Sequence, residues 1–219
     1  MNSMENTNTV RLVIPKRNKY YKTYINDAFV GCLYLRDFEN VGLKKPSECK
    51  ETEDGEIIYY DIPDVVVEDI EDVIYLRAFD KAVDLLSRIE MSASGIRTKL
   101  RLKDYSDGII DKVIDELYSR NYLNDFRFVE SYVRSYMRSK SRSLIVRELE
   151  NIGIDTSECS AVIDGVYEDE NVTEDSVVEE LLSKKFTKEQ LTDIKVKRRA
   201  MSYLARHGFS YDVINNYLT

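Results

Sequence analysis

The sequence predicts a mainly α-helical protein: a tandem array of three three-helix units, preceded by a small N-terminal antiparallel β extension. Three observations predict it. A signal that ends one helix and starts the next recurs three times along the chain. Apolar residues beyond position 63 recur at the helical period. Residues 9–35, in contrast, are rich in the β-branched and aromatic residues of strands.

The recurring signal, called the stop signal below, reads Leu, three residues, Gly or Asp, a large apolar residue, then Ser or Asp. Its copies are residues 100–106, 149–155 and 204–210. The Gly or Asp suits the left-handed conformation that ends a helix, and the apolar residue after it folds back onto the leucine in a Schellman motif. The last residue of each copy, Ser106, Asp155 or Ser210, is expected to cap the next helix.

The β extension is expected to be a meander over residues 9–35, with turns at 15–19 and at Asn26-Asp27. Residues 57–60 suit a further short strand after a turn at Asp54-Gly55. The acidic residues in this part of the chain suit a solvated surface loop. Three short strands are marginal alone, so the sheet is expected to pack on a helix.

From Pro63 onward we expect only helices, beginning with an entry helix capped at Asp64. Residues 113–118 and 162–167 align at an offset of 49, which is also the offset between the first two stop signals. Two separate matches at one offset indicate an internal repeat. The third unit follows at an offset of 55, with the extra residues expected around 186–191. Such an array is expected to be elongated, each unit contacting mainly its neighbour.

The expected organisation has four parts. They are residues 1–62, a β-rich extension with an acidic loop; 63–122, the entry helix and three-helix repeat 1; 123–169, repeat 2; and 170–219, repeat 3.

The sequence offers little for catalysis. Cys32, Cys49 and Cys159 lack zinc-site spacing, and their odd number argues against a disulfide framework. The one histidine, His207, lies in a stop signal, and the chain carries no nucleotide-binding or metalloprotease motif. We therefore expect no enzyme, no cofactor and no metal site. No apolar run reaches the roughly 18 residues of a membrane span, so the protein is expected in the cytoplasm.

The net charge of −8 is unevenly distributed along the chain. Residues 46–75 hold one base against eleven acids, whereas two later stretches are basic. The candidate partner-binding residues are Arg127, Arg134, Arg138, Lys140, Arg142, Arg147, Lys195, Lys197, Arg198, Arg199 and Arg206. For the first six, an ordinary solvated helix face competes with a contact for phosphates or carboxylates. The last five are denser, with no acid between 195 and 206.

Three stretches together carry a family resemblance. Residues 121–133 place an apolar pair before Asn124, Asp125, a basic residue and an aromatic-led helix. Residues 140–154 form a helix that opens Lys-Ser and closes at Glu-Leu before its stop, and 204–210 end on Gly-Phe and a small cap. These features resemble the RecX family, bacterial regulators of the RecA recombinase, some of which carry an N-terminal β extension.

The chain departs from the family pattern at Asn124, where an acid is usual, at Ser141, where glycine is usual, and at Gly95, where glutamate often stands. These departures affect helix caps rather than the repeat.

The resemblance implies binding along the groove of a RecA–single-stranded DNA filament. It also implies restraint of RecA's ATPase, strand exchange and co-protease activities, although some family members act differently. The protein is expected to be a monomer. Weak direct contact with DNA is a further expectation, and contact with membranes is not expected. Two other functions stay open. One is a helix-turn-helix DNA-binding regulator, which the acidic net charge disfavours; the other is a helical adaptor for a different protein.

Overall fold

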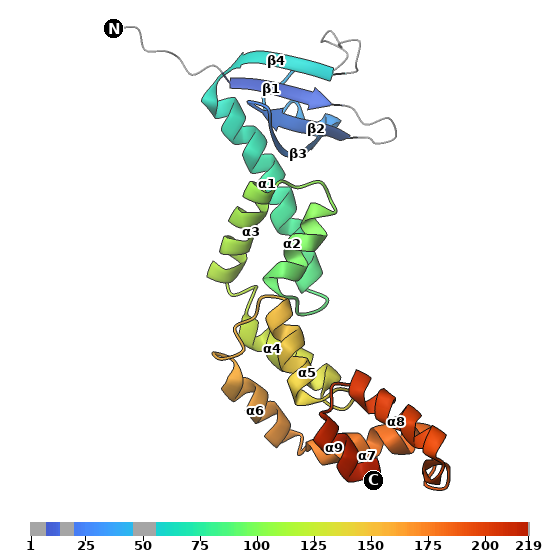
Figure 1. Cartoon of the computed structure of the whole chain (residues 1–219). Coiled ribbons are helices and arrows are strands. Elements are labelled where there is room, and N and C mark those ends of the chain that lie inside the picture. Colours follow the sequence, from blue (N-terminus) through green and yellow to red (C-terminus); the bar gives the residue numbers. More distant parts are fainter. Residues whose placement is uncertain (1–7, 14–19, 46–55, 219) are drawn as a thin grey trace. The chain divides into compact units, whose positions relative to one another are not determined.

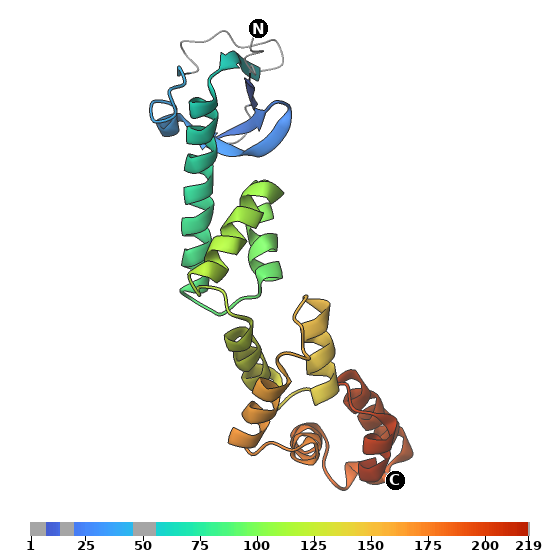
Figure 2. The same ribbon diagram turned by 90° about the vertical axis from the view of Figure 1, so that its left-hand side faces the viewer.

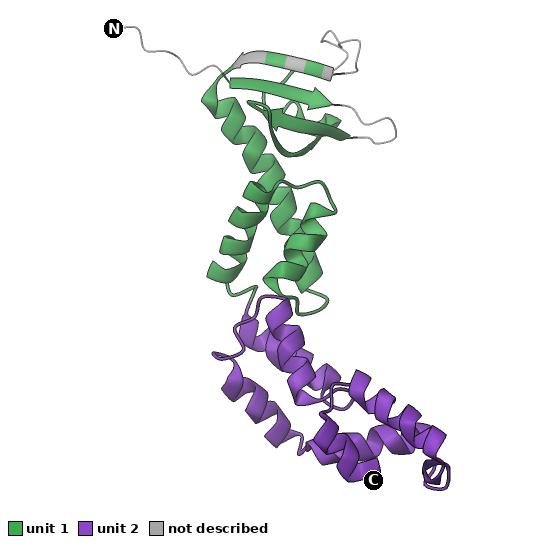
Figure 3. Ribbon diagram, in the orientation of Figure 1, with its two compact units in different colours: residues 1–123 green, residues 124–219 purple. Residues whose placement is uncertain are grey.

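The computed structural model describes residues 8–13, 20–45 and 56–218. The turns expected at 15–19 and at Asp54-Gly55, and Cys49, lie outside the described residues. The chain forms two compact units, residues 1–123 and 124–219 (Figure 3). The four-part division expected from the sequence stays a prediction.

A four-stranded antiparallel sheet opens the first unit. Its strands are β1 (Asn8–Val13), β2 (Tyr20–Ile25), β3 (Ala28–Tyr34) and β4 (Glu56–Ile62), in the order β3-β2-β1-β4. Asn26 and Asp27 have φ values of 47° and 65°, as a tight hairpin of primed type requires. The meander is thereby confirmed, and so is the further strand. Two of the acids expected in a loop, Glu56 and Asp61, lie within β4, where Glu56 pairs with Val13 of β1. The acids from 48 to 54 lie outside the described residues.

The helix α1 (Asp64–Leu86) is a single long helix, where the sequence predicted an entry helix followed by a separate first helix of repeat 1. It has no Gly or Pro to interrupt it. The cap predicted at Asp64 is wrong, because the N-cap is Pro63, whose side chain accepts no bond, and Asp64 is already helical.

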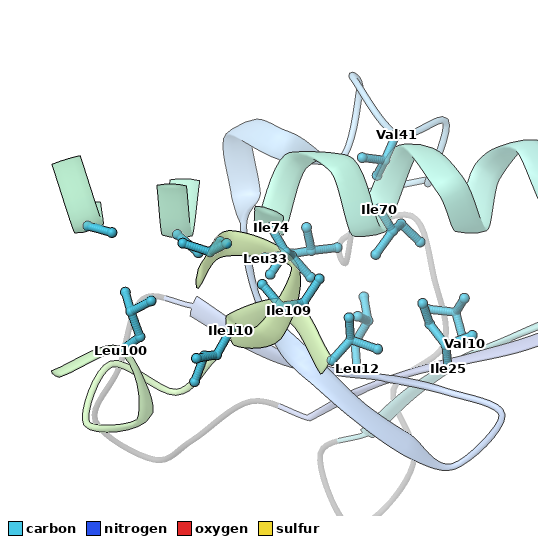
Figure 4. Packing of buried hydrophobic residues seen from close by; sticks show 14 of the residues in the cluster. Val10, Leu12, Ile25, Leu33, Val41, Ile70, Ile74, Leu100, Ile109 and Ile110 are labelled. Carbon is cyan, nitrogen blue, oxygen red and sulfur yellow. The ribbon is translucent and has the colours of Figure 1, made fainter. Parts of the chain in front are cut away.

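One hydrophobic core joins the sheet to the helices α1, α2 (Ala93–Arg101) and α3 (Asp107–Ser119). Ile70 and Ile74 of α1 are fully buried and lie beside Leu33 of β3 (Figure 4). The helix runs from the sheet to α2 and α3 (Figures 1 and 2). The expectation that the sheet packs on a helix is confirmed.

The second unit is all helical, with its own continuous core. Its helices are α4 (Asp125–Tyr136), α5 (Arg142–Asn151), α6 (Ser160–Asp169), α7 (Glu174–Lys185), α8 (Ile194–Arg206) and α9 (Tyr211–Leu218). A 3-10 turn, Gln190–Thr192, overlaps the end of the stretch, around 186–191, where the extra residues of the third unit were expected. Val129 and Val133 form the buried stripe of α4. Phe126 and Tyr136, also on α4, are 50% and 37% exposed and lie outside that stripe.

All three stop signals adopt the predicted geometry. Asp104, Gly153 and Gly208 have φ values of 59°, 89° and 89°. The amide of the following residue then donates to the carbonyl of the leucine five positions back, at 3.4 Å for Leu100, 3.1 Å for Leu149 and 3.3 Å for Leu204. Each signal therefore ends its helix as a Schellman motif does.

The capping prediction is right for two signals and wrong for the third. Ser106 and Ser210 accept bonds from backbone amides three residues on. Asp155 instead accepts from the amide and hydroxyl of Ser157. Helix α6 starts five residues after Asp155, with Cys159 at its N-cap. The carboxylate thus stabilises a turn rather than a helix start.

Two further helix ends of the same kind were missed. Asn121 and Asn171 have φ values of 56° and 49°, and the residues after them bond back to the carbonyls of Leu117 (2.8 Å) and Tyr167 (3.1 Å). Asparagine is the residue after glycine that best tolerates this conformation, so Asn followed by an apolar residue is the signal that would have found them.

Candidate partner-binding surfaces

Most of the cations predicted on α4 and α5 have acidic partners from other parts of the second unit. Arg134 lies 2.6 Å from Glu170, at the end of α6, and 3.2 Å from Glu130 on its own helix. Arg138 reaches the same Glu170 at 3.5 Å. The carboxylate of Glu170 therefore joins α4 to the end of α6.

Lys140 and Arg142, at the start of α5, are also paired. The ammonium of Lys140 lies 2.6 Å from Glu148 and 4.0 Å from the ring centre of Tyr136. Burial acts to raise the pKa of Glu148, but the hydrogen bonds from Lys140 and Tyr132 outweigh it and hold that pKa below its ordinary value. Arg142 forms an ion pair with Asp164 of α6.

The remaining two cations of this stretch differ in exposure. Arg127 is half-buried, and its amide donates to the cap residue Asn124 at 3.0 Å. Arg147 is exposed. Four of the six predicted cations thus form ion pairs: Arg134, Arg138 and Arg142 reach acids of α6 or its end, and Lys140 pairs with Glu148 of α5. This favours the structural interpretation for this face.

The five cations predicted on α8 are placed differently. Asp193 caps the helix by accepting from the amides of Lys195 (2.6 Å) and Val196 (3.3 Å). Ala200 and Leu204 face the core. Lys197 is half-buried and the other four predicted cations are exposed. Within residues 8–13, 20–45 and 56–218, none of the five cationic groups forms an ion pair with a carboxylate within 4.0 Å.

Three of these cations line one groove, which we call the α8 groove. Its volume is about 560 Å³, and its cationic side chains are Lys185, Arg198, Arg199 and Arg206. Phe186, Val196 and Tyr203 supply its apolar surface. Lys195 and Lys197 do not line it. A groove of this size suits a few side chains of a ligand.

The groove brings together residues that the sequence analysis missed. Lys185 ends α7, and its ammonium lies 4.2 Å from the ring centre of Tyr203 on α8. Phe186 packs edge-on against the same ring, with the two centroids 6.0 Å apart. The sequence could not place Lys185 here, because its position depends on how α7 and α8 pack. The 186–193 connection, predicted only as an insertion, is what brings Phe186 to the groove.

Two further properties hold for residues 8–13, 20–45 and 56–218. None of their helices has the length and apolarity needed to cross a membrane. No cluster of three or more His, Cys, Asp or Glu side chains among them is placed to hold a metal ion.

Comparison with known proteins identifies two of the three-helix units. The model of the first three-helix domain of RecX matches residues 78–117, from the second half of α1 to α3. The model of the third three-helix domain of RecX matches residues 173–218, from the cap of α7 to α9. No curated protein matches the chain.

A solved structure supports this fold. The crystal structure of regulatory protein RecX matches with a TM-score of 0.52 and 19% identity, covering 95% of this chain and 97% of that one. The crystal structure of RecX from Lactobacillus salivarius matches at 25% identity over 65% of this chain and 92% of that one, with a TM-score of 0.49. With a first and a third RecX domain in the right order along one chain, the protein belongs to the RecX family.

Proposed function

We propose that this protein binds RecA recombinase and RecA–single-stranded DNA filaments and inhibits their ATPase, strand exchange and co-protease activities. Membership of a family of non-enzymatic regulators supports a regulatory role. The observation that carries the choice of surface is the α8 cluster. Its five cations, from Lys195 to Arg206, lack acidic partners among the described residues. The protein acts in this proposal as a cytoplasmic monomer.

The α8 cluster supports the proposal because unpaired arginines retain their full capacity to bind carboxylates and phosphates. The cations of α4 and α5 would have to exchange existing partners such as Glu170 and Glu148 to do the same. We therefore place the principal contact on α8 and assign the α4–α5 cations mainly to holding the second unit together.

The test is a titration of the full chain into a RecA–single-stranded DNA ATPase assay. The proposal predicts a saturable fall in ATP hydrolysis. No change in the rate at any concentration would contradict it. A gel shift on duplex DNA without RecA separates the helix-turn-helix alternative, because tight and sequence-specific binding there would favour a DNA-binding regulator.

A further inference from the structure

The α8 groove combines several cationic side chains with an apolar surface. Three guanidinium groups and one ammonium group surround it, from Arg198, Arg199, Arg206 and Lys185. The Nε of Arg206 donates to the carbonyl of Ser202 at 3.2 Å, which orients the rest of that guanidinium. Arginine binds carboxylates through two parallel hydrogen bonds, so an array of arginines recognises several acids held close together.

We propose that the α8 groove binds a short acidic peptide segment of the protein partner, one in which Asp or Glu residues flank an aromatic or aliphatic side chain. This inference deepens the proposed function and rests on it for the identity of the partner. It assigns the carboxylates to Arg198, Arg199 and Arg206, and the apolar side chain to the surface of Phe186 and Val196.

The geometry favours a peptide over single-stranded nucleic acid. Sequence-tolerant binding of single strands uses aromatic rings on which bases stack. The ring of Tyr203 is already in contact with Lys185 at 4.2 Å, with Phe186 at 6.0 Å and with His207 at 4.5 Å. With neighbours on its several sides, this ring is poorly placed to take a base.

The distribution of charge along the chain also favours a peptide over nucleic acid. Acids flank the basic stretch at Glu189, Asp193 and Asp212. The whole chain carries a net charge of −8. Non-specific affinity for nucleic acid depends on many phosphate contacts, which a chain of this net charge, with acids next to its basic stretch in the sequence, disfavours. A few carboxylates need only the local cluster. Charge complementarity therefore fits a short anionic segment.

The experiment measures fluorescence anisotropy of a fluorescein-labelled peptide that alternates Glu or Asp with Phe and Leu. It uses the full chain at physiological ionic strength. Three proteins are compared: wild type, the groove variant R198Q/R199Q/R206Q, and the charge-matched variant K188Q/K195Q/K197Q, whose three lysines do not line the groove. We expect saturable binding by wild type, binding weaker by about tenfold or more in the groove variant, and a change within about twofold in the matched variant.

Equal losses in the two variants would overturn the inference, because binding would then follow net charge rather than the groove. A tighter, groove-dependent affinity for an oligothymidine than for the peptide would overturn it as well. The same peptide with Asn and Gln in place of its acids should not bind. Circular dichroism and equal Tm values confirm that the variants are folded.

The RecA–single-stranded DNA ATPase assay, run in parallel, keeps the two proposals apart. A wild type that alters the ATPase rate but does not bind the peptide overturns this inference and leaves the proposed function standing. A wild type that binds the peptide through the groove but never alters the ATPase rate overturns the proposed function. In that case the groove would still be a site for acidic peptides.

Discussion

The hydroxyl of Ser141 donates a hydrogen bond to the carbonyl oxygen of Gly208, 2.7 Å away and 67 residues later in the chain. The same hydroxyl accepts from the amide of Leu144 at 3.2 Å and so caps α5. The amide of Ser141 donates to the carbonyl of His207 at 2.8 Å, and the imidazole Nδ1 of His207 lies 2.5 Å from the carbonyl of Ser139. The third stop signal is thus bound to the α4–α5 connection, and the two halves of the second unit are joined there.

Replacing Ser141 with alanine is expected to destabilise the second unit by roughly 2–3 kcal/mol. The substitution removes a helix cap and leaves the carbonyl of Gly208 without this donor in a place where Ser141 is only 1% exposed. Urea unfolding followed by circular dichroism measures the change. Ser92→Ala is the matched control, since it removes a similar cap from α2 but no bond to a distant segment. Equal losses in the two variants would contradict this account.

Gly208 and Gly153 form a natural pair for testing the stop signals. Both have φ of 89°, so alanine strains the backbone at either position by about 1–2 kcal/mol. At Gly153 an added Cβ meets nothing within 4 Å. At Gly208 it would lie 2.6 Å from the Oγ of Ser141 and would collide with Leu144.

Gly208→Ala is therefore expected to cost about 3 kcal/mol or more, against about 1–2 kcal/mol for Gly153→Ala. Thermal and urea unfolding of the two variants measure the difference. Similar free energies of unfolding would show that the contact between the third stop signal and the α4–α5 connection is loose.

A buried ion pair holds the sheet to α1 in the first unit. The guanidinium of Arg77 donates to both carboxylate oxygens of Asp37 at 2.7 Å, and to the carbonyl of Cys32 at 3.1 Å. The Asp37 side chain is only 6% exposed. Removing one partner of a buried pair leaves an uncompensated charge, so Asp37→Ala is expected to destabilise the first unit by about 3 kcal/mol or more.

Urea unfolding of Asp37→Ala checks this expectation, with Asp84→Ala as the control. Asp84 pairs with Arg88 and Lys81 on the surface of α1, where such pairs are worth at most about 1 kcal/mol. A loss at Asp37 as small as the loss at Asp84 would mean that the pair does not hold the sheet in place.

Asp104, the left-handed residue of the first stop signal, also fastens β2 to the α2–α3 connection. Its carboxylate accepts from the hydroxyl of Tyr20 at 2.8 Å and from Lys22 at 3.2 Å. The hydrogen bond to Asp104, with smaller contributions from burial and from the charge of Asp104, raises the pKa of Tyr20 to about 12.

The hydrogen bond between Tyr20 and Asp104 makes the stability of the first unit depend on pH. The folded protein keeps the Tyr20 proton more tightly than the unfolded chain, whose tyrosines ionise near pH 10. The contribution of this bond to stability is complete below about pH 10 and is lost as the pH rises towards 12. Asp104→Asn should bring the pKa of Tyr20 down towards its ordinary value.

Spectrophotometric titration of tyrosinate measures this shift, and subtraction of the matching Tyr20→Phe protein isolates the signal of Tyr20. The difference curve should have its midpoint near pH 12 in wild type and lower in Asp104→Asn. The same midpoint in both backgrounds would contradict the role given to Asp104.

Local signals in the sequence were enough to predict the order of elements. Gly153, Gly208 and Asp104 end helices through backbone conformations that only a few residue types tolerate. The mistakes also have local causes. The carboxylate of Asp155 can accept hydrogen bonds in a turn as readily as at a helix cap. The sequence between 64 and 86 contains no residue that indicates whether it forms one helix or two.

The candidate surfaces were less predictable because ion pairing depends on tertiary contacts. Arg134, Arg138 and Arg142 lie in a stretch with few acids, yet Glu170 and Asp164 reach them from α6. The α8 cluster was seen from the sequence, whereas the groove was not, since Lys185 and Phe186 join it only through the packing of α7 on α8. Counting charges along the chain thus identifies cations but not their partners.

The central claim is that the α8 cluster carries the contact with the RecA filament. Its most direct test compares inhibition of RecA–single-stranded DNA ATPase by wild type, by K197E/R198E/R199E, and by the charge-matched variant R88E/K99E/K103E, whose substituted residues are exposed on the first unit. We predict that the α8 variant loses inhibition by about tenfold or more in concentration, while the control inhibits like wild type. Unchanged inhibition by the α8 variant, with all three proteins folded, would contradict the claim.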